Sequence, residues 1–252
     1  MQNLNYGVIG NCSTAALISE KGAIEWLCFP EFDSPSVFAA ILDRQKGGHF
    51  GFKVTSDYKV TQSYVPHTNI LSTHFESEEG AFDVVDFMPC YPTSDGKDFY
   101  RPAEIYRYIR WAKGRPRMKV DYRPAPNYAR GKTIYNVTSQ YVETYSSVEN
   151  KDRQYLYSLD LKKVVNHDEI TLEKDEFFLF SFNEKVIPVD IEREKLEYCR
   201  TLVYWLNWTD HAKRYTRYNE VIERSMLVLK LMTYRNGAVM AAVTTSLPET
   251  VG

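Results

Sequence analysis

The feature that most constrains the fold is a long series of short, strand-like segments in residues 1–187, each bounded by turn-forming residues. Residues 103–111 (AEIYRYIRW) alternate with a period of two, which places Ile105 and Arg107 on one face and Tyr106 on the other. Strands that recur about every 8–12 residues, with few helices between them, are typical of antiparallel sandwiches. The sequence therefore predicts a mainly β fold, a large antiparallel β-sandwich.

Local signals predict the individual elements of this sandwich. Residues 17–29 are expected to form a hairpin, because Gly22 can adopt the positive φ that its turn requires. Residues 118–122 are expected to pair back onto residues 103–111. A short helix is expected at residues 37–43, capped by Ser34 or Ser36. Further strands are expected at residues 47–54, 57–65, 69–77, 81–88, 132–137, 139–145, 154–161, 169–173 and 177–182.

The pattern changes near Pro188, where helical periodicity begins. A helix is expected over residues 190–215, with Asp190 as its N-cap, and a second over residues 219–233. Each helix has apolar side chains at steps of three and four: Leu196, Cys199, Val203 and Leu206 on the first, and Ile222, Met226, Leu229 and Thr233 on the second. Helices with such wide apolar faces need packing partners, so we expect self-association or a partner polypeptide.

Composition narrows the classes of function. A formal net charge of −2 argues against a general nucleic-acid or anionic-membrane binder. No apolar run approaches the ~18 residues of a membrane helix. The N-terminus does not resemble a signal peptide, and neither the four cysteines nor the five histidines have metal-site spacing. We therefore expect a cytoplasmic protein with reduced thiols and no bound metal.

Two stretches, one at each end of the chain, carry a family resemblance. The first contains Ile9-Gly10-Asn11-Cys12, Thr14-Ala15-Ala16-Leu17, Trp26-Leu27-Cys28 and Phe32-Asp33-Ser34-Pro35. The second contains Leu229-Lys230-Leu231-Met232-Thr233-Tyr234, Gly237-Ala238-Val239-Met240-Ala241-Ala242 and Thr244-Thr245-Ser246-Leu247-Pro248-Glu249. Together they resemble the front part of the prokaryotic glycoside hydrolase family 15 proteins, the glucoamylase, glucodextranase and trehalase-like enzymes.

The resemblance implies a specific domain organisation. It assigns residues 1–187 to an N-terminal β-sandwich of the galactose-mutarotase-like super-sandwich type. Residues 188–216 would be a linker helix, and residues 217–252 the first segment of an (α/α)6 catalytic barrel. The family hydrolyses α-glucosidic bonds with inversion and without a cofactor. Its catalytic carboxylates follow later blocks that these 252 residues do not contain, so the resemblance implies no catalytic residue here.

Few residues of this chain are candidates for chemistry on a sugar. Glycoside hydrolysis needs two carboxyl groups, a proton donor and a base. Asp83 and Asp86 are expected on opposite faces of a strand, and a structural role as turn carboxylates bonding to backbone N–H groups is expected for them. By resemblance, the residues that border the sugar pocket are Thr244, Thr245, Ser246 and Glu249, with Phe32 and Asp33 in a loop that faces the barrel. The alternative for Thr244, Thr245 and Ser246 is that they bond to turn backbone.

These observations leave two functions open. The first is the non-catalytic N-terminal portion of an inverting, exo-acting α-glucoside hydrolase of glucoamylase or trehalase type. Its partners would be an α-glucoside or oligosaccharide substrate of the complete enzyme and the remaining (α/α)6 barrel. The second is a stand-alone sandwich that binds carbohydrate or mediates assembly, including a homo-oligomer. Neither involves nucleic acid or a membrane.

Overall fold

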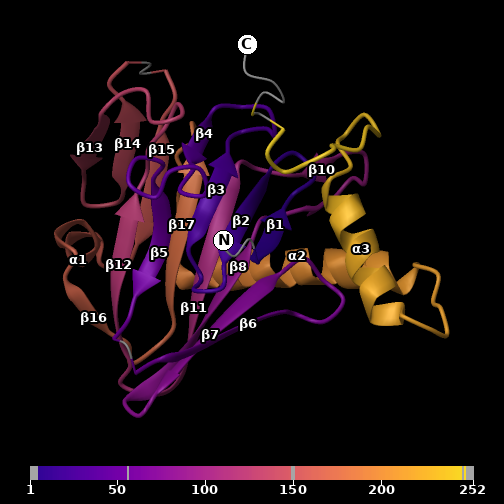
Figure 1. Ribbon diagram of the computed structural model, residues 1–252, viewed down its shortest axis with the longest axis horizontal. Coiled ribbons are helices and arrows are strands. Elements are labelled where there is room, and N and C mark those ends of the chain that lie inside the picture. The colour runs from indigo at the N-terminus through magenta and orange to yellow at the C-terminus, as the bar shows by residue number, and fades with distance from the viewer. Residues whose placement is uncertain (1–4, 56, 149–150, 246, 248–252) are drawn as a thin grey trace.

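Two antiparallel sheets pack face to face in the computed structural model, which describes residues 5–55, 57–148, 151–245 and 247 (Figure 1). Within these ranges the chain is mainly β with few helices, which confirms the predicted sandwich. The first sheet has the strand order β1-β2-β3-β5-β12-β16, with β4 beside β3. Its strands are β1 (Tyr6–Gly10), β2 (Ala15–Ser19), β3 (Ile24–Cys28), β4 (Ser36–Phe38), β5 (His49–Lys53), β12 (Arg117–Arg123) and β16 (Glu169–Thr171).

The second sheet runs in the order β13-β14-β15-β17-β11-β8-β7-β6. Its strands are β6 (Lys59–Tyr64), β7 (Leu71–Ser77), β8 (Gly80–Phe87), β11 (Glu104–Gly114), β13 (Thr133–Val137), β14 (Val142–Ser146), β15 (Gln154–Ser158) and β17 (Glu176–Phe182). A small separate ribbon pairs β9 (Tyr91–Pro92) with β10 (Phe99–Tyr100). The helices are α1 (Leu161–Asn166), α2 (Ile191–Asp210) and α3 (Asn219–Leu231).

The predicted hairpin at residues 17–29 is confirmed as β2 and β3, with Gly22 at a φ of 74° in its turn. Three other local expectations were wrong. Residues 37–43 are not helical, because the N–H groups of Ala39 and Ala40 donate to the carbonyls of Gly47 and Gly48. The strand expected to run to residue 161 ends at Ser158, and α1 follows it.

The third wrong expectation concerns β12, which does not pair with β11. Both hydrogen-bonding edges of β11 are taken, one by β8 and the other by β17. The chain therefore crosses to the other sheet after Gly114, and β12 lies between β5 and β16. The strands β11 and β12 are neighbours in the sequence but lie in different sheets, so the segment between them connects the two layers.

The interior between the sheets is largely aromatic, with one buried ion pair at its centre. Phe50 of the first sheet meets Phe178 of the second at 5.9 Å between ring centroids. Arg107 and Asp86 are both fully buried, and the Arg107 Nε donates to Asp86 Oδ1 at 2.7 Å. The guanidinium also donates across the interface to the carbonyls of Phe50, at 2.6 Å, and Gly22. One side chain of the second sheet thus satisfies carbonyls of two segments of the first.

Helix α2 lies along the outer face of the second sheet, behind the sheets in Figure 1. Its N-cap is Asp190, as predicted, and the Asp190 carboxylate accepts from the N–H of Arg193 at 2.8 Å. The face that it buries is polar and aromatic: Glu194, Glu197, Thr201, Tyr204, Trp205 and Thr209. The predicted apolar stripe of Leu196, Cys199, Val203 and Leu206 points away from the sandwich and is exposed.

Helix α3 projects from one end of the sandwich and contacts it beside β1 (Figure 1). Leu231 and Leu227 are its buried side chains. A Cβ at Gly10 would lie 2.9 Å from Leu231 Cδ2, so the glycine permits this close approach. Within the part of the chain that the structure describes, no helix has the length and apolarity needed to cross a bilayer.

Candidate functional site

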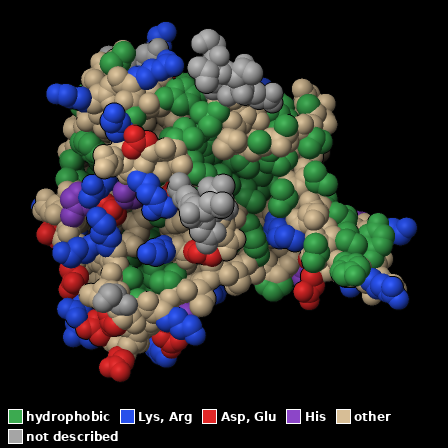
Figure 2. Space-filling model, viewed as in Figure 1, with side chains coloured by type: hydrophobic (Ala, Val, Ile, Leu, Met, Phe, Trp, Pro, Cys, Tyr) green, Lys and Arg blue, Asp and Glu red, His purple; other side chains and the backbone are tan. Residues whose placement is uncertain are grey.

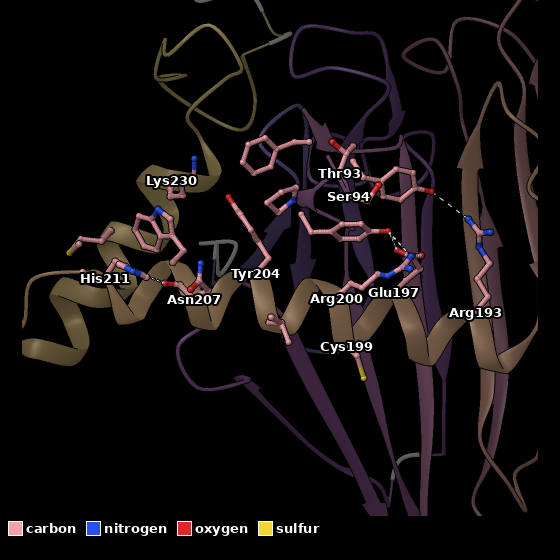
Figure 3. Close-up of a pocket in the computed structure, with 18 of the residues that line it drawn as sticks. Thr93, Ser94, Arg193, Glu197, Cys199, Arg200, Tyr204, Asn207, His211 and Lys230 are labelled. Atoms are coloured by element: carbon pink, nitrogen blue, oxygen red, sulfur yellow. Dashed lines mark hydrogen bonds and ion pairs between the residues drawn. The ribbon is translucent and has the colours of Figure 1, made fainter. Parts of the chain in front are cut away.

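The candidate site is a groove of about 1470 Å³ between α2, α3 and the β9–β10 ribbon (Figure 3). We call it the α2–α3 groove. Its wall on the ribbon side is aromatic, with Tyr91, Phe99 and Tyr100. The α2 wall combines charged, polar and apolar side chains, and α3 contributes Met226 and Lys230. The groove exists because α2 packs along the second sheet, whereas α3 projects away from the sandwich.

A charged cluster holds one end of the groove in place. Tyr91 Oη donates to Glu197 Oε2 at 2.6 Å, and Arg200 Nη1 donates to Glu197 Oε1 at 3.3 Å (Figure 3). Burial, followed by the neighbouring Glu197 carboxylate, raises the pKa of Tyr91 above its ordinary value. Tyr91 is therefore a stable proton donor to Glu197, and both oxygens of that carboxylate are occupied.

A second cluster continues from the groove into the buried face of α2. Arg193 donates from Nε to Tyr106 Oη at 3.2 Å and from Nη2 to Tyr100 Oη at 3.4 Å. Tyr106 in turn donates to Glu104 Oε2 at 2.8 Å. Burial, with the charges of Glu104 and Glu197 behind it, raises the pKa of Tyr100 to about 12. These hydroxyls stay protonated at neutral pH and position the aromatic wall.

The lip of the groove is apolar and exposed. Val203 lines the groove and is 63% exposed. Hydrophobic side chains also gather over α3 and the segment after it in Figure 2, where Val221, Leu229 and Val239 are exposed. In contrast, Lys, Arg and His side chains gather over the outer face of the first sheet. Contiguous exposed apolar surface beside a hollow is typical of a protein interface.

The carboxyl groups near the hollows do not form an acid–base pair. Among the described residues that line the α2–α3 groove, Glu197 is the one carboxylate, and it is bonded to Tyr91 and Arg200. Another hollow of about 730 Å³, on the outer face of the first sheet, is lined by Asp121, Glu20 and Glu25. Glu20 accepts from the Asn5 Nδ2, and Glu25 accepts from the Tyr6 hydroxyl at 2.5 Å. Burial acts to raise the pKa of Asp121, but Lys53, His49 and Arg123 together hold it well below its usual range.

The two aspartates of β8 point to opposite faces, as predicted. Asp86 faces the interior and pairs with Arg107, and burial raises its pKa while the guanidinium opposes that shift. Asp83 bonds to His74 Nδ1 at 2.7 Å and to Arg110 at 3.0 Å. The expectation that these are turn carboxylates bonded to backbone N–H groups was wrong, because both lie within a strand and are neutralised by cationic side chains.

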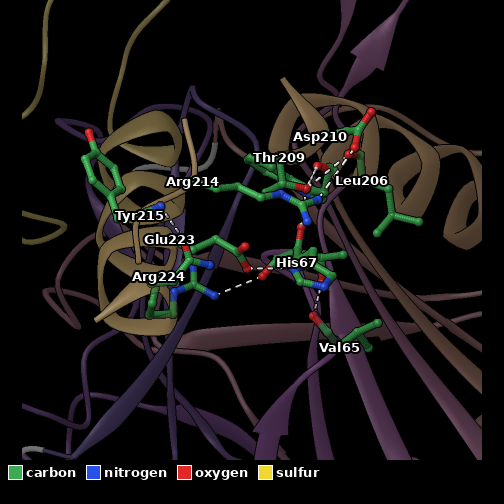
Figure 4. Close-up of polar contacts among 12 residues, drawn as sticks. Val65, His67, Leu206, Thr209, Asp210, Arg214, Tyr215, Glu223 and Arg224 are labelled. Atoms are coloured by element: carbon green, nitrogen blue, oxygen red, sulfur yellow. Dashed lines mark hydrogen bonds and ion pairs between the residues drawn. The ribbon is translucent and has the colours of Figure 1, made fainter. Parts of the chain in front are cut away.

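A smaller hollow of about 400 Å³ separates the end of α2 from α3 (Figure 4). Its two carboxylates are also taken: Glu223 lies 2.8 Å from His67 Nδ1, and Asp210 lies 3.7 Å from Arg214. Thr209, which also lines this hollow, donates to the carbonyl of His67 at 3.2 Å. These contacts attach both helices to the β6–β7 loop and leave no carboxyl free for catalysis among the residues described there.

One loop residue holds α3 most directly. Asn69 is buried, and its Nδ2 donates to the carbonyl of Leu227 at 3.0 Å. Its Oδ1 accepts from Arg224, which also donates to the carbonyl of Thr68 at 2.9 Å (Figure 4). Arg224 stacks on the Tyr64 ring at 3.9 Å. The β6–β7 loop therefore fixes the orientation of α3 and with it the shape of the groove.

Replacing Asn69 with alanine is expected to loosen α3 without unfolding the sandwich. Removing buried hydrogen bonds to α3 costs about 1–3 kcal/mol, which corresponds to roughly ten- to hundredfold faster amide exchange in the helix. Hydrogen–deuterium exchange over α3 is the measurement. The control is Ser225→Ala, because Ser225 is exposed and bonds only within α3, to the carbonyl of Val221 at 2.8 Å. Equal exchange in both variants would contradict the assigned role of Asn69.

The structure places the six predicted pocket residues as follows. Phe32 is buried in the cluster beneath the helices, and Asp33 is exposed in the turn after it. Thr244 is half-buried, and Thr245 is exposed with its hydroxyl donating to the carbonyl of Ala242 at 2.6 Å. Ser246 and Glu249 lie outside the described residues. Their assignment to a sugar pocket stays a prediction, and Thr245 makes the turn bond that the structural alternative requires.

The structure does bring together the two sequence stretches that carry the resemblance. The Trp26 indole is fully buried, and its Nε1 donates to the carbonyl of Val243 at 3.0 Å. Glu31 Oε1 accepts from the Tyr234 hydroxyl and from Arg235 at 3.4 Å. The described parts of the two stretches are thus joined by these hydrogen bonds.

The sequence reading did not identify the α2–α3 groove. Glu197 and Arg200 have the spacing of a helical ion pair, and Tyr91 and Tyr100 flank a turn, but neither pattern indicates that they meet. Of the four tryptophans, Trp26 and Trp205 are buried, Trp111 is 38% exposed, and Trp208 lines the groove. Across the described residues, no group of three His, Cys, Asp or Glu side chains is arranged to hold a metal ion.

Comparisons with known proteins, by family model and by individual relatives, agree with one another. The family model described as "Trehalase-like, N-terminal" matches residues 5–158. The chain is 31% identical to a trehalase of Thermoplasma acidophilum over 94% of its own length and 41% of the relative. It is 33% identical to trehalase 1 of Sulfolobus acidocaldarius over 98% of its own length and 40% of the relative. A trehalase of Mycolicibacterium smegmatis is 28% identical over the same shares.

The chain spans about two fifths of the length of the curated relatives that it matches. The family-model match covers more than half of the chain and falls on the sandwich rather than the helices. The match and the relatives, which cover almost the whole chain, together confirm the resemblance. The chain therefore belongs to the trehalase-like N-terminal family.

Proposed function

We propose that these 252 residues form the non-catalytic front of an inverting, exo-acting α-glucoside hydrolase of trehalase or glucoamylase type. The observation that carries the proposal is the α2–α3 groove, which has an apolar lip and one carboxylate that is already bonded. An inverting glycosidase needs two carboxyl groups far enough apart to hold a water. The carboxylates that line the groove and the two hollows described above are bonded to neighbouring side chains, which favours a structural role.

The groove has the properties of a surface that receives another polypeptide. About three fifths of the length of each of these relatives lies outside the region that matches this chain. Helix α3 is held at a fixed angle by Asn69 and Arg224, so the groove is shaped before anything fills it. Val203 and Leu229 leave apolar area open on both of its helices. We infer that a domain equivalent to the remaining part of the relatives, an (α/α)6 barrel by resemblance, packs there.

The chain alone is expected to release no glucose from trehalose, maltose or maltooligosaccharides. The reason is that no described hollow combines a proton donor with a free base. Glucose release is measured with a coupled assay at several pH values, and the full-length Thermoplasma acidophilum trehalase is the positive control. Hydrolysis that persists after repurification, and that disappears on Glu197→Gln, would contradict the proposal.

The second candidate is a module that assembles with copies of itself or binds carbohydrate. The exposed stripe on α2 favours the first form, because it is the largest unpaired apolar feature of that helix. If copies associate through it, Val203→Glu is expected to yield monomers in light scattering at high concentration, while Val148→Glu leaves association unchanged. Val148 is 65% exposed and is absent from the groove lining, so it is the matched control. A monomeric wild type excludes the self-assembling form of this candidate.

A further inference from the structure

Two buried cysteine thiols face each other beneath the helices. Cys12 follows β1 in the first sheet, and Cys90 follows β8 in the second. Both side chains are fully buried, and their sulfur atoms lie 4.0 Å apart. Cys12 Sγ is also 3.4 Å from the carbonyl of Lys230 in α3. The pair therefore lies where the two sheets and α3 meet.

The backbone around Cys12 is built to hold the sulfur in this place. Cys12 has a φ of 66°, in the left-handed region that few residues with a side chain adopt. Asn11 holds the turn, because its Oδ1 accepts from the N–H groups of Ser13 and Thr14, both at 3.1 Å. Asn11 Nδ2 also donates to the carbonyl of Pro102 at 2.8 Å, which fixes the turn to the segment before β11.

Of the two sulfurs, Cys12 is the one that loses its proton more easily. The hydrogen bond from Cys90 lowers the pKa of Cys12, and burial opposes this shift. The charges of Lys230 and Arg101 lower it further. The pKa of Cys90 is raised, because its hydrogen is shared with Cys12 and because it is buried. Cys12 is thus the nucleophile of the pair and Cys90 its resolving partner.

We propose that Cys12 and Cys90 form a peroxide-reactive pair that closes to an intramolecular disulfide between the two sheets. A disulfide requires the sulfurs to approach from 4.0 Å to about 2.05 Å. Both residues lie in connections outside the strand ladders, so side-chain rotation can supply this movement.

The chemistry balances with hydrogen peroxide as the oxidant. Cys12 gives up its proton, its sulfur attacks one peroxide oxygen, an S–O bond forms, the O–O bond breaks, and the leaving hydroxide takes the Cys12 proton to become water. The Cys90 sulfur then attacks the Cys12 sulfenic acid. An S–S bond forms, the S–O bond breaks, and the leaving hydroxide takes the Cys90 proton. Two thiols are oxidised by two electrons, and one peroxide is reduced to two waters.

Closure of the disulfide affects α3 as well as the sheets. The reduced Cys12 thiol donates to the carbonyl of Lys230, and the oxidised sulfur has no hydrogen to donate. The last turn of α3 therefore loses a partner when the cross-link forms. We expect faster amide exchange at the end of α3 in the oxidised protein, and recovery after reduction.

The test compares the reduced chain before and after hydrogen peroxide treatment, followed by alkylation and non-reducing peptide mapping. Before alkylation, the expected product is a monomer lighter by about 2 Da. Mapping after alkylation is expected to give a peptide that joins Cys12 to Cys90 and is released by dithiothreitol. Cys12→Ala and Cys90→Ala are each expected to abolish this product. Cys28→Ala and Cys199→Ala are the controls, since one removes a buried thiol and the other an exposed one.

Peptide mapping of the wild type keeps the test valid even if a variant fails to fold. Three results would overturn the proposal. One is a cross-link that joins Cys28 or Cys199 to another cysteine in place of the Cys12–Cys90 product. Another is oxidation of Cys12 to sulfinic acid without any cross-link. The third is a Cys12–Cys90 pair that stays reduced under conditions that fully oxidise Cys199.

Discussion

Replacing Arg107 with methionine is expected to lower the free energy of unfolding by about 3–5 kcal/mol, because one partner of a buried ion pair is removed. Asp86 would lose the guanidinium that now lies 2.7 Å from its Oδ1. The carbonyls of Phe50 and Gly22 would lose their donors at the same time. Urea unfolding followed by tryptophan fluorescence measures the loss, with a separate check that the slope m is unchanged.

The double variant Arg107→Met with Asp86→Leu distinguishes the effect of the two charges from the effect of the volume that the side chains fill. Removing both charges avoids a buried, unpaired carboxyl group, so the double variant is expected to regain at least half of the lost stability. Arg110→Met is the surface control, because the Arg110 side chain is 52% exposed beside Asp83, and about 0–1 kcal/mol is expected there. If Arg107→Met lowers the free energy of unfolding no more than Arg110→Met does, the contacts that Arg107 makes between the sheets are not important for stability.

The side-chain alternation in β11 shows how much of the fold the sequence can predict. Alternation in residues 103–111 predicted that Ile105 and Arg107 share a face, and the two side chains are both buried between the sheets. The same alternation cannot show which strand lies opposite. The pairing of Arg107 with Asp86 depends on the β8–β11 register, which a distant part of the chain determines.

The wrong expectation for β12 has the same origin. Adjacent strands usually pair, and Gly114 and Pro116 read as a hairpin turn. Local signals do not reveal that β17, more than sixty residues further along the chain, already occupies the free edge of β11. Local sequence patterns therefore predicted most element types correctly. They could not predict which of several strands, far apart in the sequence, would pair with a given sheet edge.

The candidate site was less predictable than the fold. The apolar stripe on α2 was identified, and the need for a partner follows from it. The structure adds that the sandwich is not that partner, because it takes the opposite face of α2, with Tyr204 and Trp205. The aromatic wall of the groove comes from a short ribbon that no periodic pattern marks, since β9 and β10 contain two residues each.

The buried face of α2 also contains the group with the second large expected effect, Glu194. Its side chain is almost fully buried, and its Oε1 has no hydrogen-bond partner. Burial, followed by the charges of Asp86 and Glu104, raises the pKa of Glu194 well above its ordinary value of 4.5. Between these two pKa values the folded protein holds a proton that the unfolded chain has released. Stability contributed by this group therefore falls as the pH rises from about 4.5.

Glu194→Gln is expected to remove this pH dependence, because glutamine is similar in size and does not titrate. The difference in unfolding free energy between variant and wild type should grow by about 1.4 kcal/mol per pH unit above pH 5, in favour of the variant, until the folded pKa is reached. Urea unfolding at intervals between pH 5 and 8 measures this slope. Glu192→Gln is the matched control on the same helix, since the Glu192 side chain is 79% exposed. Its curve should run parallel to that of the wild type. A parallel curve for Glu194→Gln would instead mean that α2 carries an ionised Glu194 against the sheet, and that the helix packs less tightly there than the burial of this residue indicates.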